Sequence, residues 1–123
     1  MDEPALRDAL HRAGYIADEA LATTLWLAGE LQRPLLLEGD AGVGKTALAA
    51  AFARAHGRRL VRLQCHEGID LAQAAYEWNY GRQLLAIRLH ETQPEKVRET
   101  DLFAREYLLE RPLLAAIASE QPV

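Results

Sequence analysis

The sequence predicts an α/β fold in which a buried strand, a glycine-rich loop and a helix follow one another. Residues 35–38 (Leu-Leu-Leu-Glu) form a short apolar run typical of a buried strand, and the alanine-rich residues 46–56 predict a helix. Between them, residues 39–46 read Gly-Asp-Ala-Gly-Val-Gly-Lys-Thr and fit the phosphate-binding pattern G-x-x-x-x-G-K-[ST] at every specified position. The order strand, loop, helix is the structural setting in which this pattern binds nucleotides.

The loop has the residue types that a metal-bound polyphosphate requires. Its glycines allow the backbone to turn its N–H groups toward the ligand and to approach phosphates closely, and the helix that follows adds the positive end of its dipole. Lys45 is expected to reach the β- and γ-phosphates of ATP, and the Thr46 hydroxyl is expected to ligate Mg²⁺. The residues expected to surround the phosphates are Gly39, Asp40, Ala41, Gly42, Val43, Gly44, Lys45 and Thr46.

A glycine-rich turn before an ordinary amphipathic helix is the alternative interpretation of the same residues. It does not explain why a lysine stands at the start of a helix, where a cation opposes the helix dipole. We therefore expect a nucleotide-binding loop, with Lys45 as the catalytic residue that stabilises charge developing on the γ-phosphate.

Composition and charge narrow the classes of partner. The chain has 123 residues, which suits one domain, and its net charge of −4 argues against nucleic acid as the main partner. The arginines at positions 54, 58, 59 and 62 are expected to form a solvated rim beside a strand. Cys65 is the only cysteine, so neither a disulfide nor a thiolate metal site is expected. The sequence has no signal-peptide pattern and no apolar run of membrane-spanning length, so we expect a cytoplasmic location.

Residues 1–33 are expected to form a helical lead-in to the loop. Pro4 suits the first turn of a helix, and Gly14 is a natural stop for that helix. A second helix is expected to begin after Asp18 and to end near residue 32, because Pro34 disfavours helix at the residue before it.

Residues 34–65 are expected to form a strand–loop–helix–strand unit. Gly57 should close the helix that follows the loop, and residues 60–65 predict a second strand. The unit would be a right-handed crossover of a parallel sheet. The residues predicted to form the buried face of the helix are Leu48, Ala49, Phe52 and Ala55.

Residues 66–123 predict helical segments. Asp70 suits the N-cap of a short helix over residues 71–76. A further helix is expected over residues 82–90, with its apolar side chains partly buried. These side chains are Leu84, Leu85, Ile87 and Leu89.

The end of the sequence is expected to contain two further helices. Residues 92–99 are polar and predict a surface connection. Asp101 is expected to cap a helix that runs through residue 108, and a last helical segment is expected over residues 113–117.

An acidic strand is missing between Cys65 and Val123. A nucleotide hydrolase of this class needs a strand ending in carboxylates, which hold Mg²⁺ through water and orient the attacking water. A parallel sheet of two strands would also leave long unpaired edges. We therefore expect the chain to be the N-terminal piece of a longer protein, cut before its third strand.

The sequence resembles the MoxR family of AAA+ ATPases over nearly its whole length. The resemblance rests on Gly14-Tyr15-Ile16 ahead of a helix, on residues 35–46, and on residues 62–85, which read RLQCHEGIDLAQAAYEWNYGRQLL. It implies a P-loop NTPase (AAA+) fold with three αβα layers, here truncated before the Walker B strand. In such a sheet the first and second strands are not neighbours. The resemblance also implies that Tyr15 and Ile16 pack on the adenine of ATP; the alternative interpretation is a turn that ends the preceding helix, with a packed tyrosine.

The resemblance further implies a chaperone-like ATPase that assembles as a homo-oligomeric, hexameric ring. Such proteins assist the assembly or maturation of protein complexes or metalloenzymes, often with a partner that carries a von Willebrand factor A domain. The complete protein would hydrolyse ATP·Mg²⁺, and the 123-residue chain alone is expected to be inactive. The aromatic residues Tyr76, Trp78 and Tyr80 have two interpretations: a contact surface for a client near the ring's central opening, or packing between a helix and the sheet. Packing is favoured.

Two other function classes stay open on the residues alone. A P-loop small-molecule kinase would need an arginine-rich lid and an acceptor pocket, and the sequence displays neither. A non-hydrolysing nucleotide-binding interaction module would keep the loop but would release no phosphate.

Overall fold

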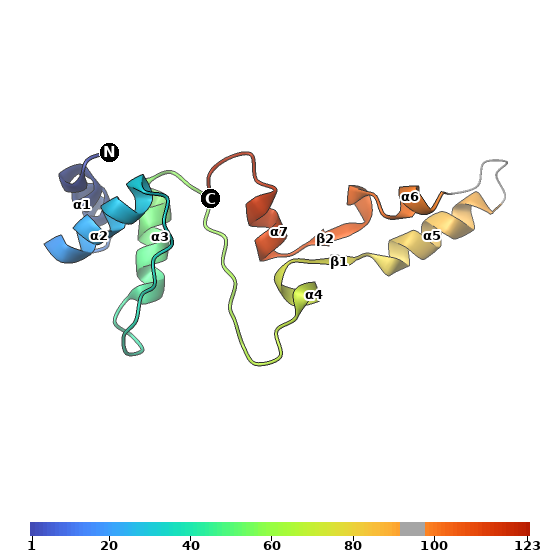
Figure 1. Cartoon of the computed structure of the whole chain (residues 1–123), viewed down its shortest axis with the longest axis horizontal. Helices are drawn as coiled ribbons and strands as arrows, with labels where there is room; N and C mark the ends of the chain where they lie inside the picture. The colour runs from blue at the N-terminus through green and yellow to red at the C-terminus, as the bar shows by residue number, and fades with distance from the viewer. Residues whose placement is uncertain (92–97) are drawn as a thin grey trace. The chain divides into compact units, whose positions relative to one another are not determined.

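The computed structural model of the chain describes residues 1–91 and 98–123, which form two compact units (Figure 1). Unit 1 comprises Met1–Leu60 with Gln121–Val123, and unit 2 comprises Val61–Glu120. The surface connection expected over residues 92–99 lies largely outside the described residues.

Unit 1 is built from three helices: α1 (Glu3–Arg12), α2 (Glu19–Glu30) and α3 (Lys45–Ala55). Aspartate side chains begin the first two. Asp2 Oδ1 accepts a hydrogen bond from the Ala5 N–H at 2.9 Å, and Asp18 Oδ1 accepts one from the Leu21 N–H at 2.8 Å. Such caps satisfy N–H groups that have no partner within the helix. The helices predicted before and after the loop are therefore confirmed.

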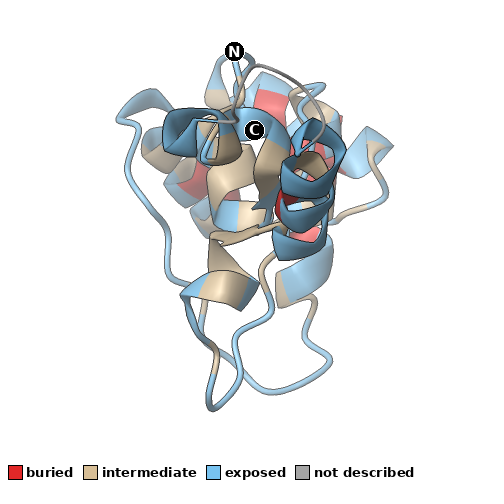
Figure 2. Ribbon diagram, turned by 90° about the vertical axis from the view of Figure 1, so that its right-hand side faces the viewer, coloured by how far each residue is buried: buried red, intermediate tan, exposed pale blue. Residues whose placement is uncertain are grey.

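The core of unit 1 lies where α1 contacts α2 and α3. Figure 2 shows the buried residues in red, and all of them lie in helices. Ala49 of α3, predicted to be buried, is exposed. The alanines of this helix differ little in hydrophobicity, so the sequence pattern could not select which of them face inward. The core residues are Leu6, Leu10, Leu25, Leu48 and Ala51.

The two strands predicted over residues 35–38 and 60–65 are not formed. Both segments lack regular secondary structure, and neither pairs with another strand among the described residues. A strand exists only when its N–H and C=O groups bond to a neighbouring strand, and the apolar pattern that predicted these strands supplies no such neighbour. Leu37 nevertheless packs against the core of unit 1, while Leu36 is 80% exposed.

Unit 2 contains a short sheet that the sequence did not predict. Strands β1 (Tyr76–Trp78) and β2 (Leu108–Glu110) pair antiparallel, with Tyr76 opposite Glu110 and Trp78 opposite Leu108. The pairing extends at both ends, because the Asn79 N–H donates to the Tyr107 carbonyl at 2.7 Å and the Arg111 N–H donates to the Ala75 carbonyl at 2.9 Å. The observed sheet is therefore antiparallel, not the parallel sheet that the sequence predicted.

The other elements of unit 2 flank the sheet or lie between its strands. Asp70 caps α4, as predicted, by accepting from the Gln73 N–H at 3.0 Å. The segment between β1 and β2, residues 79–107, leaves the sheet and returns to it, and we call it the arm. The elements are α4 (Leu71–Ala74), α5 (Tyr80–His90), α6 (Glu99–Leu102), the 3₁₀ turn η1 (Arg105–Tyr107) and α7 (Pro112–Ile117).

Two predictions about the arm are wrong. The helix expected from Asp101 through residue 108 is instead α6, which ends at Leu102, followed by η1 and β2. Its Asp101 carboxylate accepts from the Arg98 N–H at 3.2 Å, so it lies within the first turn rather than at the cap. The side chains expected to be partly buried in α5 are exposed, at 61% for Leu84, 58% for Leu85, 38% for Ile87 and 61% for Leu89.

The buried position of α5 carries a polar side chain. Gln83 is the buried residue of α5, and its amide donates to the Leu102 carbonyl at 2.6 Å. Apolar side chains occur around α5 on several sides, so the sequence pattern could not single out this position.

Aromatic side chains pack around the short sheet. The Tyr76 and Trp78 rings lie edge to face with centroids 6.3 Å apart, and Trp78 meets Phe103 in the same way at 5.1 Å. This geometry is favourable for aromatic pairs. It accounts for Tyr76 and Trp78 as packing residues, whereas Tyr80 is 62% exposed. None of the helices in the described part of the chain has the length and hydropathy needed to cross a lipid bilayer.

Candidate nucleotide-binding loop

The glycine-rich loop of unit 1 leads directly into α3. Gly42 and Gly44 have φ angles of +84° and +99°, which residues with a side chain rarely adopt. Gly44 is the N-cap of α3, and its carbonyl accepts from the Leu48 N–H at 3.0 Å. The loop therefore needs glycine at both positions in order to turn from the segment at residues 35–38 into the helix.

The Lys45 side chain curls back over the loop that precedes it. Its ammonium donates to the carbonyl of Gly39 and, at 2.6 Å, to the carbonyl of Asp40. A Cβ atom on Gly39 would lie 3.2 Å from Val43 Cγ2 and 3.9 Å from Lys45 Nζ, so the two ends of the loop come close together. This arrangement brings one positive charge to the mouth of a closed backbone turn.

The backbone of the loop offers hydrogen-bond donors. Within the part of the chain that the structure describes, the backbone N–H groups of Lys45, Thr46 and Ala47 donate no hydrogen bond to another protein atom. The N–H groups of Lys45, Thr46 and Ala47 belong to the first turn of α3, where the helix dipole favours an anion. Thr46 is exposed in the same turn. A polyphosphate can bind here, because unpaired N–H donors, a helix N-terminus and an ammonium group all favour an anion.

Tyr15 lies beside the end of the loop. A Cβ atom on Gly44 would be 3.5 Å from both the ring and the hydroxyl oxygen of Tyr15, and the tyrosine is half-buried against the core of unit 1. The structure thus brings Tyr15 together with the predicted phosphate loop, although the two are far apart in sequence. Ile16, predicted for the same role as Tyr15, is 85% exposed.

Arg54 is a neighbour of this region that the sequence analysis did not identify as part of the site. It was expected to belong to a solvated rim, and it is indeed exposed, but its guanidinium Nη2 donates to the Ala13 carbonyl at 2.9 Å. Ala13 immediately precedes the Gly14–Tyr15 turn. No local sequence signal marks this contact, because the two residues are 41 positions apart.

Among the described residues, no group of three or more histidine, cysteine, aspartate or glutamate side chains is placed to hold a metal ion. The oxygen ligands that the loop side chains offer to Mg²⁺ are the exposed hydroxyl of Thr46 and the exposed carboxylate of Asp40. This fits a cation that keeps most of its water and binds mainly to nucleotide phosphates.

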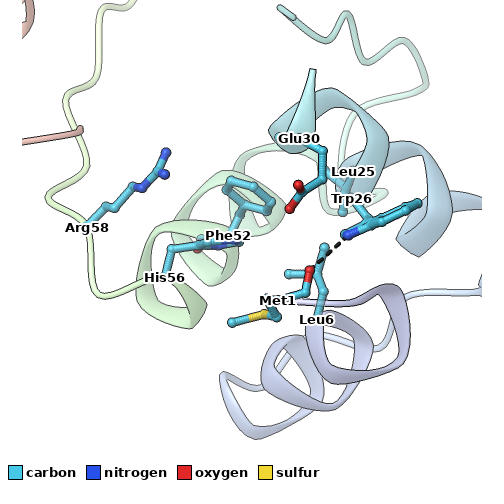
Figure 3. Close-up of a pocket in the computed structure, with 9 residues that line it drawn as sticks. Met1, Leu6, Leu25, Trp26, Glu30, Phe52, His56 and Arg58 are labelled. Atoms are coloured by element: carbon cyan, nitrogen blue, oxygen red, sulfur yellow. Dashed lines mark hydrogen bonds between the residues drawn. The ribbon is translucent and has the colours of Figure 1, made fainter. Parts of the chain in front are cut away.

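A separate cavity of about 230 Å³ lies among the three helices of unit 1 (Figure 3). Its lining includes Trp26, whose Nε1 donates to the Met1 carbonyl at 2.9 Å, and Phe52, whose ring lies beside the His56 ring at a tilt of 36° with centroids 4.2 Å apart. None of the loop residues lines it. The cavity is therefore distinct from the candidate nucleotide site.

Comparison with known proteins identifies the family. Residues 34–101, more than half of the chain, match the model of the AAA domain, dynein-related subfamily. The chain belongs to this family. The matched range of the AAA domain begins just before the phosphate loop and ends within α6 of the arm. The matched range includes the glycine-rich loop of residues 39–46.

The AAA domain is also similar to curated proteins. It is 42% identical to Midasin of Giardia intestinalis over 66 residues, which cover 46% of this chain, and 35% identical to Midasin of Dictyostelium discoideum over 72 residues, which cover 48%. In both cases the match spans 1% of the length of the relative. No solved structure gives a significant match.

Proposed function

We propose that this chain is the nucleotide-binding part of a MoxR-type AAA+ ATPase and that its loop binds ATP·Mg²⁺. The observation that carries the proposal is the loop itself: unpaired N–H donors at the start of α3, with the Lys45 ammonium turned back over them. Membership in the AAA+ class supports ATP as the ligand. The MoxR assignment rests on the sequence blocks at residues 14–16 and 62–85.

Each part of the nucleotide would meet a different group of residues. The phosphates would accept hydrogen bonds from the backbone of residues 39–46, and Lys45 would exchange its bonds to loop carbonyls for bonds to the β- and γ-phosphates. The Thr46 hydroxyl would ligate Mg²⁺, and Tyr15 with Ile16 would contact the adenine. Bound Mg²⁺ would neutralise charge on the phosphates.

Hydrolysis would require carboxylates that orient water against the γ-phosphate. The resemblance to AAA+ ATPases implies that a Walker B strand supplies these carboxylates, and no part of this sequence matches it. We therefore propose turnover by the complete protein and no turnover by the 123 residues alone.

By the same resemblance, the complete protein would act as a cytoplasmic, chaperone-like motor. It would form a hexameric ring and assist the assembly or maturation of protein complexes or metalloenzymes. A protein with a von Willebrand factor A domain would be its partner.

The second candidate is a nucleotide-binding module that binds ATP at the loop but never hydrolyses it. Calorimetric titration with Mg·ATP, followed by a phosphate-release assay on the complete protein, distinguishes the candidates. Binding with phosphate release in the absence of an acceptor supports the ATPase. Binding without release supports the module, and release only to an added acceptor would indicate a kinase. If Mg·ATP does not bind, the proposed site is wrong.

A further inference from the structure

The turn that follows α1 holds Tyr15 in place through backbone hydrogen bonds. The Gly14 N–H donates to the His11 carbonyl at 2.9 Å, and the Tyr15 N–H donates to the Leu10 carbonyl, also at 2.9 Å. This is the Schellman pattern of a helix C-terminus, with Gly14 in the left-handed conformation at φ +85°. The pattern leaves the carbonyl of Ala13, the C-cap, available to a donor from outside α1.

Helix α3 supplies that donor. Arg54 lies in the last turn of α3, and its guanidinium donates to the Ala13 carbonyl at 2.9 Å. A cation at a helix C-terminus is also favoured by the helix dipole, so the contact is stabilised in two ways. At the other end of α3, Gly44 lies against the Tyr15 ring. One helix therefore contacts the same turn from both of its ends.

This double contact links the turn to the phosphate loop. Because Gly44 begins α3 and Arg54 is in its last turn, α3 acts as a rigid spacer between the loop and the Ala13 carbonyl. If the Arg54 bond is lost, the turn loses its hydrogen bond to α3 and keeps only packing contacts with the core of unit 1, made by Ala13, Tyr15 and Ala17. Tyr15 would then shift with respect to the site where phosphates bind.

We propose that Arg54 is a positioning residue that holds Tyr15 in the part of the nucleotide site that binds the base. The inference rests on the proposed function, in which the phosphates bind at residues 39–46 and the base contacts Tyr15. Arg54 touches neither; it acts through the Ala13 carbonyl by holding Tyr15 where an adenine can pack on it. Its removal should therefore weaken a ligand that has a base much more than a ligand made only of phosphates.

The test compares Mg·ATP with Mg·tripolyphosphate by calorimetric titration of the purified protein. For Arg54→Ala we expect affinity for Mg·ATP to fall about tenfold, which is of the order contributed by one base stacked on an aromatic ring, and affinity for Mg·tripolyphosphate to change less than about twofold. Arg54→Lys should restore most of the ATP affinity, because its ammonium can donate to the same carbonyl. Arg7→Ala removes the same charge from the exposed surface of α1 and should change neither affinity.

A second variant disturbs the turn without altering charge. Gly14 has φ +85°, and a Cβ atom at this position would have no neighbouring atom within 4 Å, so Gly14→Ala strains the turn without creating a clash. It should reproduce the selective loss of ATP affinity, and it serves as the test if Arg54→Ala does not fold by circular dichroism.

Two results would overturn the inference. One is an unchanged ratio of ATP to tripolyphosphate affinity in Arg54→Ala and Gly14→Ala. The other is an equal loss of affinity for both ligands. It would mean that the positive charge of Arg54 attracts phosphates in general, or that Arg54 stabilises the whole of unit 1. If the original protein binds neither ligand, the proposed function itself fails, and that result is distinct from both of these.

Discussion

Replacing Lys45 by alanine tests the proposed phosphate site most directly. In the structure the Lys45 ammonium donates two hydrogen bonds to loop carbonyls, and in the complex it would donate an equivalent pair to phosphate oxygens. A hydrogen bond with a charged partner contributes about 1.5–3 kcal/mol, so the loss of two corresponds to about 3–6 kcal/mol. The Kd for Mg·ATP should therefore rise by about two to four orders of magnitude.

The assay is calorimetric titration of Mg·ATP, with circular dichroism to confirm that the variant is folded. Arg12→Ala is the matched control, because it also removes one positive charge from an exposed position of unit 1. Its Kd should stay within about twofold of the original, since exposed charges contribute little. A Lys45→Ala protein that is folded and binds Mg·ATP within about threefold of the original Kd would refute the assignment of the loop as the phosphate site.

Three further predictions concern the loop and the core that supports it. Thr46→Val should abolish the gain in ATP affinity that Mg²⁺ provides, whereas Thr46→Ser should keep it; titrations with Mg²⁺ and with EDTA measure the difference. Gly42→Ala meets no atom within 4 Å but must adopt φ +84°, a strain of about 1–2 kcal/mol, and should weaken ATP binding about 5- to 30-fold by calorimetry. Leu10→Ala, at a fully buried position (0% exposed), should lower the free energy of unfolding by about 2–5 kcal/mol in urea titrations, whereas Leu36→Ala, at a position 80% exposed, should change it by less than about 0.5 kcal/mol.

The helices could be predicted because their signals are local. Asp2, Asp18 and Asp70 each precede a helix in the sequence, and each accepts a hydrogen bond from the N–H three residues later. A cap of this kind depends on neighbours within one turn, so it can be recognised without knowledge of the rest of the fold.

The strands could not be predicted for the opposite reason. The pairing of Tyr76 with Glu110 joins residues more than thirty positions apart, and the three-residue length of each strand gives little pattern to detect. Conversely, residues 35–38 carry a strand pattern but have no pairing partner among the described residues. A short apolar run establishes only that a segment can be a strand.

The candidate site likewise combines residues that a local sequence pattern predicts with contacts between helices that it does not predict. Residues 39–46 form one continuous loop, so a sequence pattern was sufficient to find them, and the family match includes them. The contacts of Gly44 with Tyr15 and of Arg54 with Ala13 cross from α3 to the end of α1. Such contacts depend on how helices pack, and no pattern within either helix encodes them.

The pairing of β1 with β2 has a consequence for how this protein can vary. Because Ala75 bonds to Arg111 and Asn79 bonds to Tyr107, the chain enters and leaves the arm at a single point. The entropy cost of closing a loop grows only slowly with its length. Homologues could therefore gain or lose residues between these anchors while α4 and α7 keep their places, which would let this region diverge in length without disturbing the short sheet at its base.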